Sequence, residues 1–141
     1  MRLLGIDAGE KRIGIAVSDR LNKTASPLTV LSNDGNLEGN LLEIIDGFEV
    51  KKIIIGIPYN LKGEKGYQAK KVEDFIKNIL INLAEAKNIE IIRIDERFTS
   101  KISEKIISDK KGKKSSSGID SISAAVLLND YIEREKAVGQ D

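Results

Sequence analysis

The chain of 141 residues contains no histidine and no cysteine. Without imidazole or thiolate it cannot build a Ser-His-Asp or Cys-His catalytic triad, and it cannot bind zinc through His and Cys ligands. Oxygen ligands remain, and these suit magnesium or manganese. Zero cysteine also excludes a disulfide framework and is what a reducing compartment permits, so we expect a cytoplasmic protein.

Long apolar segments and a strong net charge are missing as well. No apolar run approaches the ~20 residues that a membrane helix needs, and the opening residues have no signal-peptide architecture. The formal net charge is only +1, so nucleic-acid binding would have to rest on local patches. The length fits a single domain over residues 1–141 with a sizeable core, and we expect no membrane partner.

Aromatic residues are scarce, with three Phe, three Tyr and no Trp. A platform on which the bases of a single strand stack in succession is therefore not indicated. Recognition of nucleic acid by duplex shape and by its backbone fits this composition better.

Asp7 stands where an apolar strand breaks into a glycine turn. Two runs of β-forming residues, 3–6 and 13–17, flank the short polar segment around it. A charged carboxylate at the end of a buried strand costs free energy unless an opposite charge compensates it. A divalent cation would supply that compensation.

Hydrophobic periodicity predicts further strands and helices along the chain. After the opening hairpin we expect strands over 27–31, 52–57 and 89–94, and helices over about 37–48, 69–83, 100–108 and 119–134. We expect a mobile basic loop over 110–118 and a disordered tail over 136–141. Because helical crossovers join parallel strands, this order predicts an α/β fold with a mixed five-stranded sheet flanked by helices.

Three acids fall at informative places in this order. Asp7 ends the first strand, Glu96 follows the fifth, and Asp120 opens the last helix. Neighbouring central strands could bring these carboxylates to one rim, where divalent ions would neutralise their repulsion and support phosphodiester hydrolysis without histidine. Taken singly, each acid also fits a structural role: a turn for Asp7, an ion pair with Arg97 for Glu96, and a helix N-cap for Asp120.

Four segments, read in order, resemble the motifs of the YqgF family of RNase H-like nucleases. They are residues 5–9 with 11–14 and 18–19, then 56–60 (Gly-Ile-Pro-Tyr-Asn), 95–99 (Asp-Glu-Arg-Phe-Thr) and 119–125 (Ile-Asp-Ser-Ile-Ser-Ala-Ala). The family is described both as Holliday junction resolvases and as pre-16S ribosomal RNA nucleases. The resemblance covers nearly the whole chain, from Met1 to about Ile132.

The resemblance implies an RNase H-like fold and a metal-dependent nuclease that hydrolyses phosphodiester bonds of structured nucleic acid, in 5′-end processing of pre-16S ribosomal RNA. It places catalysis and metal binding on Asp7, Glu96 and Asp120, with Mg²⁺ or Mn²⁺ as the cofactor. The alternative is a DNA endonuclease of the Holliday junction resolvase type. Related bacterial resolvases carry a fourth acid three residues after the last Asp, where this chain has Ser123, which lowers the expectation of resolvase activity.

The chain departs from the family pattern at two further places. Lys62-Gly63-Glu64 stands where the family often has Asp-Gly-Thr, and serines at 115–117 interrupt a basic cluster that is usually denser. The absence of a fourth acid at Ser123 leaves the number of bound metals open.

Basic and amide side chains close to these motifs are the expected contacts to phosphate. On loops at the rim these are Lys11, Arg12, Asn60 and Arg97, and on the basic loop they are Lys110, Lys111, Lys113 and Lys114. Ordinary solvent-exposed charge and a solubilising loop are the alternative interpretations. The expected partner is structured RNA or branched DNA, bound by a monomer or a weak homodimer.

Two other classes of function remain open. The first is an ATP-binding phosphotransferase, because the actin and sugar-kinase superfamily holds nucleotide phosphates with a similar Asp-x-Gly hairpin. That superfamily uses two such domains, however, and this chain supplies one. A dinucleotide-binding domain fits less well, because residues 13–17 continue as strand where that fold begins a helix. The second class is a non-catalytic nucleic-acid-binding module, against which the presence of all three acids argues.

Overall fold

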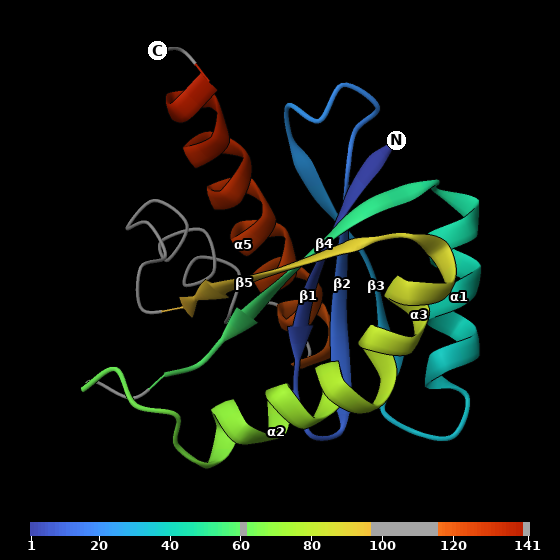
Figure 1. Cartoon of the computed structure of the whole chain (residues 1–141), viewed down its shortest axis with the longest axis vertical. Helices are drawn as coiled ribbons and strands as arrows, with labels where there is room; N and C mark the ends of the chain where they lie inside the picture. The colour runs from blue at the N-terminus through green and yellow to red at the C-terminus, as the bar shows by residue number, and fades with distance from the viewer. Residues whose placement is uncertain (60–61, 97–115, 140–141) are drawn as a thin grey trace.

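The computed structural model describes residues 1–59, 62–96 and 116–139, without the side chains of residues 116–120 and 138–139. Within these residues a sheet lies between two helical layers (Figure 1). The strands are β1 (Arg2–Ala8), β2 (Arg12–Ser18), β3 (Ala25–Ser32), β4 (Val50–Ile57) and β5 (Glu90–Asp95). The helices are α1 (Leu37–Gly47), α2 (Tyr67–Phe75), α3 (Ile81–Lys87) and α5 (Ser116–Gly139), with a π-helical turn η1 (Ile76–Leu80) between α2 and α3.

The sheet formed by the described strands is mixed, in the order β3-β2-β1-β4-β5. β1 is central, because Ile6 lies opposite both Ile15 of antiparallel β2 and Ile55 of parallel β4. β5 runs parallel to β4 at the edge. The predicted α/β architecture with a mixed five-stranded sheet is thus confirmed within the described residues. The carboxyl ends of β1, β4 and β5 share one edge, which is where parallel strands bring distant residues together.

Side-chain alternation along β1 separates the two faces of the sheet. Leu4 and Ile6 are fully buried in the larger core, which lies beneath α1, α2, η1 and α3. Leu3 packs instead against the smaller core, to which α5 contributes. Gly5 and Asp7 share the parity of Leu3, so they belong to the α5 face.

Close packing of α5 on β1 depends on Gly5. A Cβ atom at this position would lie 2.8 Å from the carbonyl oxygen of Ala124 and 2.9 Å from Cβ of Leu128. On the edge strand β3, the Asn129 side chain bonds both backbone groups of Ala25, at 2.8 Å to the N–H and 3.1 Å to the carbonyl. The helix is therefore fixed along the sheet at the level of β1.

Ser18 and Asp19, which belong to the opening motif, organise the turn between β2 and β3. Ser18 Oγ accepts the N–H of Leu3 at 2.8 Å and donates to Oδ1 of Asn22 at 2.5 Å. Asp19 Oδ1 accepts the N–H of Lys23 at 2.8 Å. This part of the motif is structural, because it holds the end of the molecule opposite to Asp7.

Several predicted boundaries differ from the observed ones. The helix expected over 69–83 is the continuous path α2–η1–α3, and α5 extends to Gly139, into the segment expected as a tail. The expected helix over 100–108, and residues 110–115 of the expected basic loop, lie outside the described residues, whereas residues 116–118 of that loop instead form the start of α5. No helix in the described part of the chain is long and apolar enough to cross a membrane.

Candidate active site

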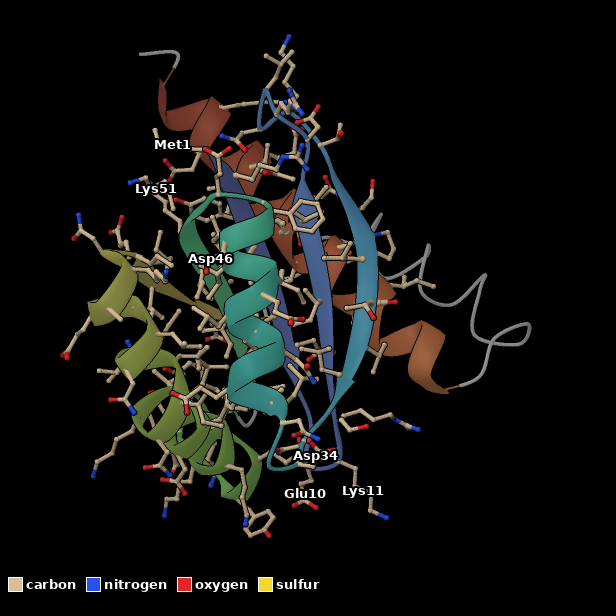
Figure 2. The ribbon with its side chains drawn as sticks, turned by 90° about the vertical axis from the view of Figure 1, so that its right-hand side faces the viewer. Met1, Glu10, Lys11, Asp34, Asp46 and Lys51 are labelled. Carbon is tan, nitrogen blue, oxygen red and sulfur yellow. The ribbon has the colours of Figure 1, made fainter. Side chains whose placement is uncertain are left out.

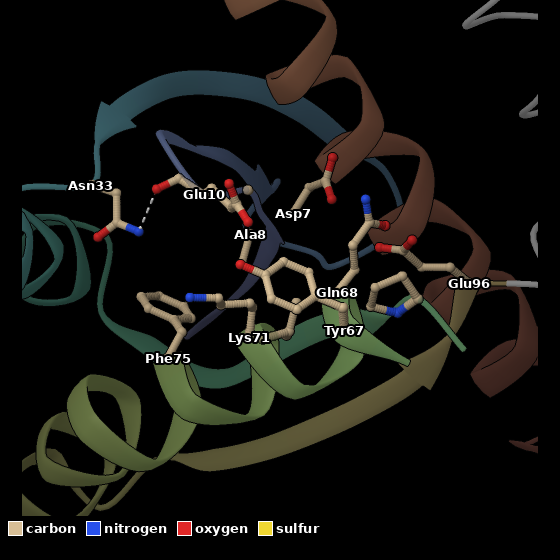
Figure 3. Close-up of a pocket in the computed structure, with 12 residues that line it drawn as sticks. Asp7, Ala8, Glu10, Asn33, Tyr67, Gln68, Lys71, Phe75 and Glu96 are labelled. Carbon is tan, nitrogen blue, oxygen red and sulfur yellow. Dashed lines mark hydrogen bonds between the residues drawn. The ribbon is translucent and has the colours of Figure 1, made fainter. Parts of the chain in front are cut away.

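Asp7 and Glu96 meet at the shared carboxyl edge of the sheet. Asp7 lies near the end of β1, and Glu96 directly follows β5, with β4 between the two strands. Their side chains nevertheless share a hydrogen bond. Figure 3 shows the two carboxyl groups on the same side of the sheet edge, close to the start of α5. The structure therefore brings together two of the three predicted acids.

Gly56 makes this meeting possible. It lies on β4 opposite Ile94 of β5, and the Glu96 side chain passes directly over it. A Cβ atom at Gly56 would lie 2.5 Å from Oε1 and 2.7 Å from Cγ of Glu96. Because Gly56 has no side chain, Glu96 can extend across β4 and reach Asp7 on β1.

Burial is the main influence on the acidity of this pair. Desolvation raises the pKa of Glu96, the nearby charge of Asp95 raises it further, and the hydrogen bond with Asp7 acts in the opposite direction. Two carboxyl groups can share a hydrogen bond only when one of them carries a proton. A cation bound to the pair would displace that proton, so this half-buried, all-oxygen donor set fits Mg²⁺ or Mn²⁺.

The described side chains alone do not complete a three-acid metal site. Within the described residues, no group of three or more Asp, Glu, His or Cys side chains surrounds one point. Asp120 lies near the start of α5, and its side chain is outside the described part of the structure.

A cavity of about 400 Å³ adjoins the two carboxyl groups. One wall is residues 7–10 at the end of β1 and the following turn, and the opposite wall is the exposed side of α2, with Tyr67, Gln68 and Lys71 (Figure 3). Sequence reasoning missed the α2 wall. A helix that begins after a glycine-rich loop at the carboxyl end of a parallel strand was the signal that could have indicated it.

Asn33 holds the turn that follows Asp7. Its side-chain Nδ2 donates to the carbonyl of Glu10 at 3.0 Å, and its backbone N–H donates to the carbonyl of Lys11 at 2.9 Å. Within the turn, the N–H of Gly9 donates to the carbonyl of Arg12 at 2.9 Å. The cavity wall that carries Asp7 and Glu10 is therefore fixed by backbone contacts.

The family model described as "RuvX: Holliday junction resolvase" matches residues 1–134. The chain belongs to the RuvX family. It is 42% identical over 133 residues to a "Putative pre-16S rRNA nuclease" of Sulfurihydrogenibium sp. (strain YO3AOP1), covering 94% of this chain and 90% of that one. A protein of the same name from Natranaerobius thermophilus is 36% identical over 140 residues, covering 96% of both chains. RuvX is another name for the YqgF family, so the predicted resemblance to these nucleases, which are hydrolases acting on ester bonds, is confirmed.

Solved structures support the fold of this RuvX chain. Thermus thermophilus RuvC in complex with a Holliday junction substrate superposes with a TM-score of 0.70 at 14% identity, covering 96% of both chains. The fowlpox virus resolvase in complex with Holliday junction DNA gives 0.57 at 18% identity, covering 96% of this chain and 99% of that one. At such identities the likeness shows the fold alone, and the predicted RNase H-like fold is confirmed.

The predicted phosphate contacts of the RuvX chain are only partly described. Lys11 in the β1–β2 turn and Arg12 at the start of β2 are both exposed and do not line the cavity. Figure 2 shows Lys11 projecting from the same end of the molecule as Glu10 and Asp34, far from Met1. The others lie outside the described residues, namely Asn60, Arg97, Lys110, Lys111, Lys113 and Lys114.

Proposed function

We propose that this RuvX chain is a divalent-metal-dependent nuclease whose active site consists of Asp7, Glu96 and Asp120. The observation that carries the proposal is the reach of Glu96 over Gly56 to a hydrogen bond with Asp7. A half-buried pair of carboxyl groups is costly for stability, and only glycine at position 56 leaves room for it. A binding role for a divalent cation explains both features.

The position of Asp120 along α5 supports its inclusion. Tyr131 Oη lies 3.5 Å from Nζ of Lys52, which is opposite Leu3, whereas Gly5 lies against Ala124. Moving along β1 toward its carboxyl end therefore means moving back along α5. Two further strand residues from Gly5 cover about 6.6 Å, and four helical residues back from Ala124 cover about 6 Å. The backbone of Asp120 thus belongs at the level of Asp7.

Each of the three acids and the two walls of the cavity has a distinct role in the proposed reaction. Asp7, Glu96 and Asp120 would hold the divalent ion, which when bound stabilises charge on the scissile phosphate and lowers the pKa of water. Burial and the negative charge of Asp95 raise the pKa of Glu96, and a bound divalent ion would offset both effects, so that Glu96 would bind it as the carboxylate. The rigid β1–β2 turn and the α2 wall enclose the place where the phosphodiester must sit.

Structured RNA is the substrate class we propose, with a precursor of 16S ribosomal RNA as its member. The names of the relatives from Sulfurihydrogenibium and Natranaerobius support it. Ser123 supports it as well, because related resolvases carry a fourth acid at this position. The description of the family model favours a second candidate, a four-way DNA junction. The lack of cysteine is consistent with action in the cytoplasm.

A paired cleavage assay tests the proposal and separates the two substrates. The protein is incubated with a structured RNA spanning a 16S precursor end and with a four-way DNA junction, each in magnesium, in manganese and in excess chelator. We expect cleavage of the RNA in either metal and none in chelator. Full activity in chelator would rule out the metal site, and cleavage of the junction alone would assign the chain to the second candidate.

A further inference from the structure

Tyr67 is exposed at the wall of the cavity that contains Asp7 and Glu96. Its exposed fraction is 67%, and among the described residues the other large apolar side chains exposed to this degree are Met1 and Leu21. Those two belong to the opposite end of the molecule, where Asn22 binds the carbonyl of Met1. Among the described residues, Tyr67 is therefore the large exposed apolar side chain at the end of the molecule that carries the cavity.

Lys71 lies one helical turn after Tyr67 and contacts it. Its Nζ is 5.3 Å from the centroid of the Tyr67 ring, within the range of a cation–π contact. Of the described residues that line the cavity, Lys71 alone is positively charged, whereas Asp7, Glu10 and Glu96 are acidic. A phosphate group inside this cavity would therefore find its cationic partner at Lys71.

Gln68 lies on the same wall of the cavity as Tyr67 and Lys71. It is exposed, lines the same cavity, and projects from α2 toward Asp7 and Glu96 (Figure 3). The α2 wall thus presents, within one turn, a ring, an amide and an ammonium group beside the carboxyl pair. A nucleotide offers the complementary set: a base with a flat π-face, polar base edges, and a phosphate.

We propose that Tyr67 and Lys71 bind one unpaired nucleotide next to the scissile phosphodiester, with the base stacked on Tyr67 and its phosphate contacting Lys71. This inference rests on the proposed function. A base inside a duplex is already stacked between its neighbours, so the substrate strand must be single-stranded or locally opened at this nucleotide. The scarcity of aromatics argues against a platform for many bases, and a single ring serves a single base.

Binding of short RNAs to the intact chain tests the site. The probes are a single-stranded RNA with one 2-aminopurine and a blunt duplex of the same sequence, in calcium, with a gel confirming that the RNA stays intact. The wild type should bind the single strand more tightly than the duplex and quench its fluorescence. Tyr67→Ala should lose the quenching and weaken binding at least about fivefold, the lower end of base–aromatic stacking, whereas Tyr67→Phe should retain both.

Lysine variants separate the specific contact from general charge. Lys71→Ala should weaken binding and flatten its salt dependence by about 0.7 in log–log slope, as expected for one lost phosphate contact on a single strand. Lys70→Ala is the matched control, because Lys70 is exposed on the same helix and does not line the cavity. It should bind as the wild type does.

Two outcomes would overturn the site: wild-type affinity and quenching in Tyr67→Ala, or equal effects of the two lysine variants. Melting curves check that each variant is folded. Cleavage by the wild type in magnesium is measured alongside. Intact cleavage with Tyr67-independent binding refutes the nucleotide site alone, whereas Tyr67-dependent binding without any cleavage refutes the nuclease proposal alone.

Discussion

Gly56 shows how the smallest residue can decide whether the pair of carboxyl groups Asp7 and Glu96 forms. Any side chain at this position would occupy the space of Glu96, because a Cβ atom would lie 2.5 Å from Oε1. Gly56→Ala should therefore push Glu96 away from Asp7 and lower the cleavage rate about 10- to 100-fold, as the loss of a residue that positions a metal ligand does. The free energy of unfolding should change little, since the end of a flexible side chain can move aside.

A matched control for Gly56→Ala is Gly39→Ala, because nothing lies within 4 Å of a Cβ atom built at Gly39 in α1. Cleavage rates and calorimetric titration of manganese give the comparison. Wild-type rate and metal affinity in Gly56→Ala would show that Glu96 does not need this path.

Glu96→Gln separates the role of the acid in activity from its cost for stability. Burial raises the folded-state pKa of Glu96, so the native state favours the protonated form. This preference stabilises the metal-free protein below the ordinary pKa of glutamate and is lost as the pH rises through the raised value. Glu96→Gln should abolish cleavage and raise the melting temperature, with a gain that grows from acidic to neutral pH.

Melting curves of both proteins in chelator, over a pH series, check this expectation. A melting temperature that falls in Glu96→Gln at neutral pH would mean that the carboxylate pairs with a cationic partner. The acid would then be structural.

Position at strand ends allowed sequence reasoning to select Asp7 and Glu96. The role of Gly56 could not be predicted, because it depends on the register that places β4 between the two acids. Tyr67 and Lys71 were missed for a similar reason: the glycine-rich loop before α2 indicates that the helix starts near this edge of the sheet, but not which of its side chains face the end of β1. A contact across elements leaves no periodic signal in the sequence.

Glu73 ties α2 to β5, and so helps to hold the cavity wall. It accepts hydrogen bonds from Lys65 Nζ at 2.8 Å and from Arg93 Nε at 2.9 Å, and its side chain is 21% exposed. Burial by itself raises the pKa of Glu73, but the bonds from Lys65 and Arg93 outweigh it and leave the pKa lowered. The stabilisation is present above the ordinary pKa of glutamate and is lost as the pH falls through the lowered value.

Glu73→Gln should therefore lower the free energy of unfolding by about 1 kcal/mol at neutral pH, the upper range for a partly exposed ion pair. The difference from the wild type should disappear in acid. Glu85→Gln, at an exposed position of α3, serves as the control. Urea unfolding at neutral and acidic pH measures both, and a loss that persists unchanged in acid would contradict the ion-pair explanation.

Elements were predicted well where a burial pattern repeats. The alternating apolar residues of β1 and β2 and the spaced apolar residues of α1 were sufficient to predict them. The π-helical turn η1 was not foreseen, because buried Ile76 and Leu80 continue the same apolar face. The end of α5 was placed too early, since its last turns are exposed and polar, and Lys136 there contacts the carbonyl of Lys23 at 3.3 Å.

The molecule as a whole is close to electrically neutral, and the lining of its cavity is mostly acidic among the described residues. Attraction of nucleic acid must then come from local basic segments, of which the lysines at 110, 111, 113 and 114 are the densest. Replacing these four with alanine should weaken binding and flatten its salt dependence by up to ~0.9 in log–log slope per lost duplex contact. The cleavage rate at saturation should stay unchanged, because such contacts do not distinguish the transition state.

Filter binding over a salt series, together with single-turnover rates, measures the effect of the lysine substitutions. Equal affinity and equal salt slope in the wild type and the variant would mean that the segment is a solvated linker. Lys11, Arg12 and Arg97 would then be the expected phosphate contacts.

The order of elements was sufficient to predict the architecture of the whole molecule, since helical crossovers between the later strands require parallel pairing beside β1. The family followed from motifs spread along the chain. Distances between the acids could not follow from either, because they depend on how far α5 slides along β1, which the contact of Gly5 with Ala124 sets.

Cleavage of a structured RNA in rising magnesium, by the wild type and by Asp7→Asn, Glu96→Gln and Asp120→Asn, tests the central claim most directly. Asp46→Asn is the control, because Asp46 lies on α1 away from the cavity (Figure 2) and pairs with Lys87 at 3.0 Å. We predict magnesium-dependent cleavage by the wild type and the control, and a loss of at least about 100-fold in each of the other three variants. Wild-type rates in all three would contradict the assignment of the active site.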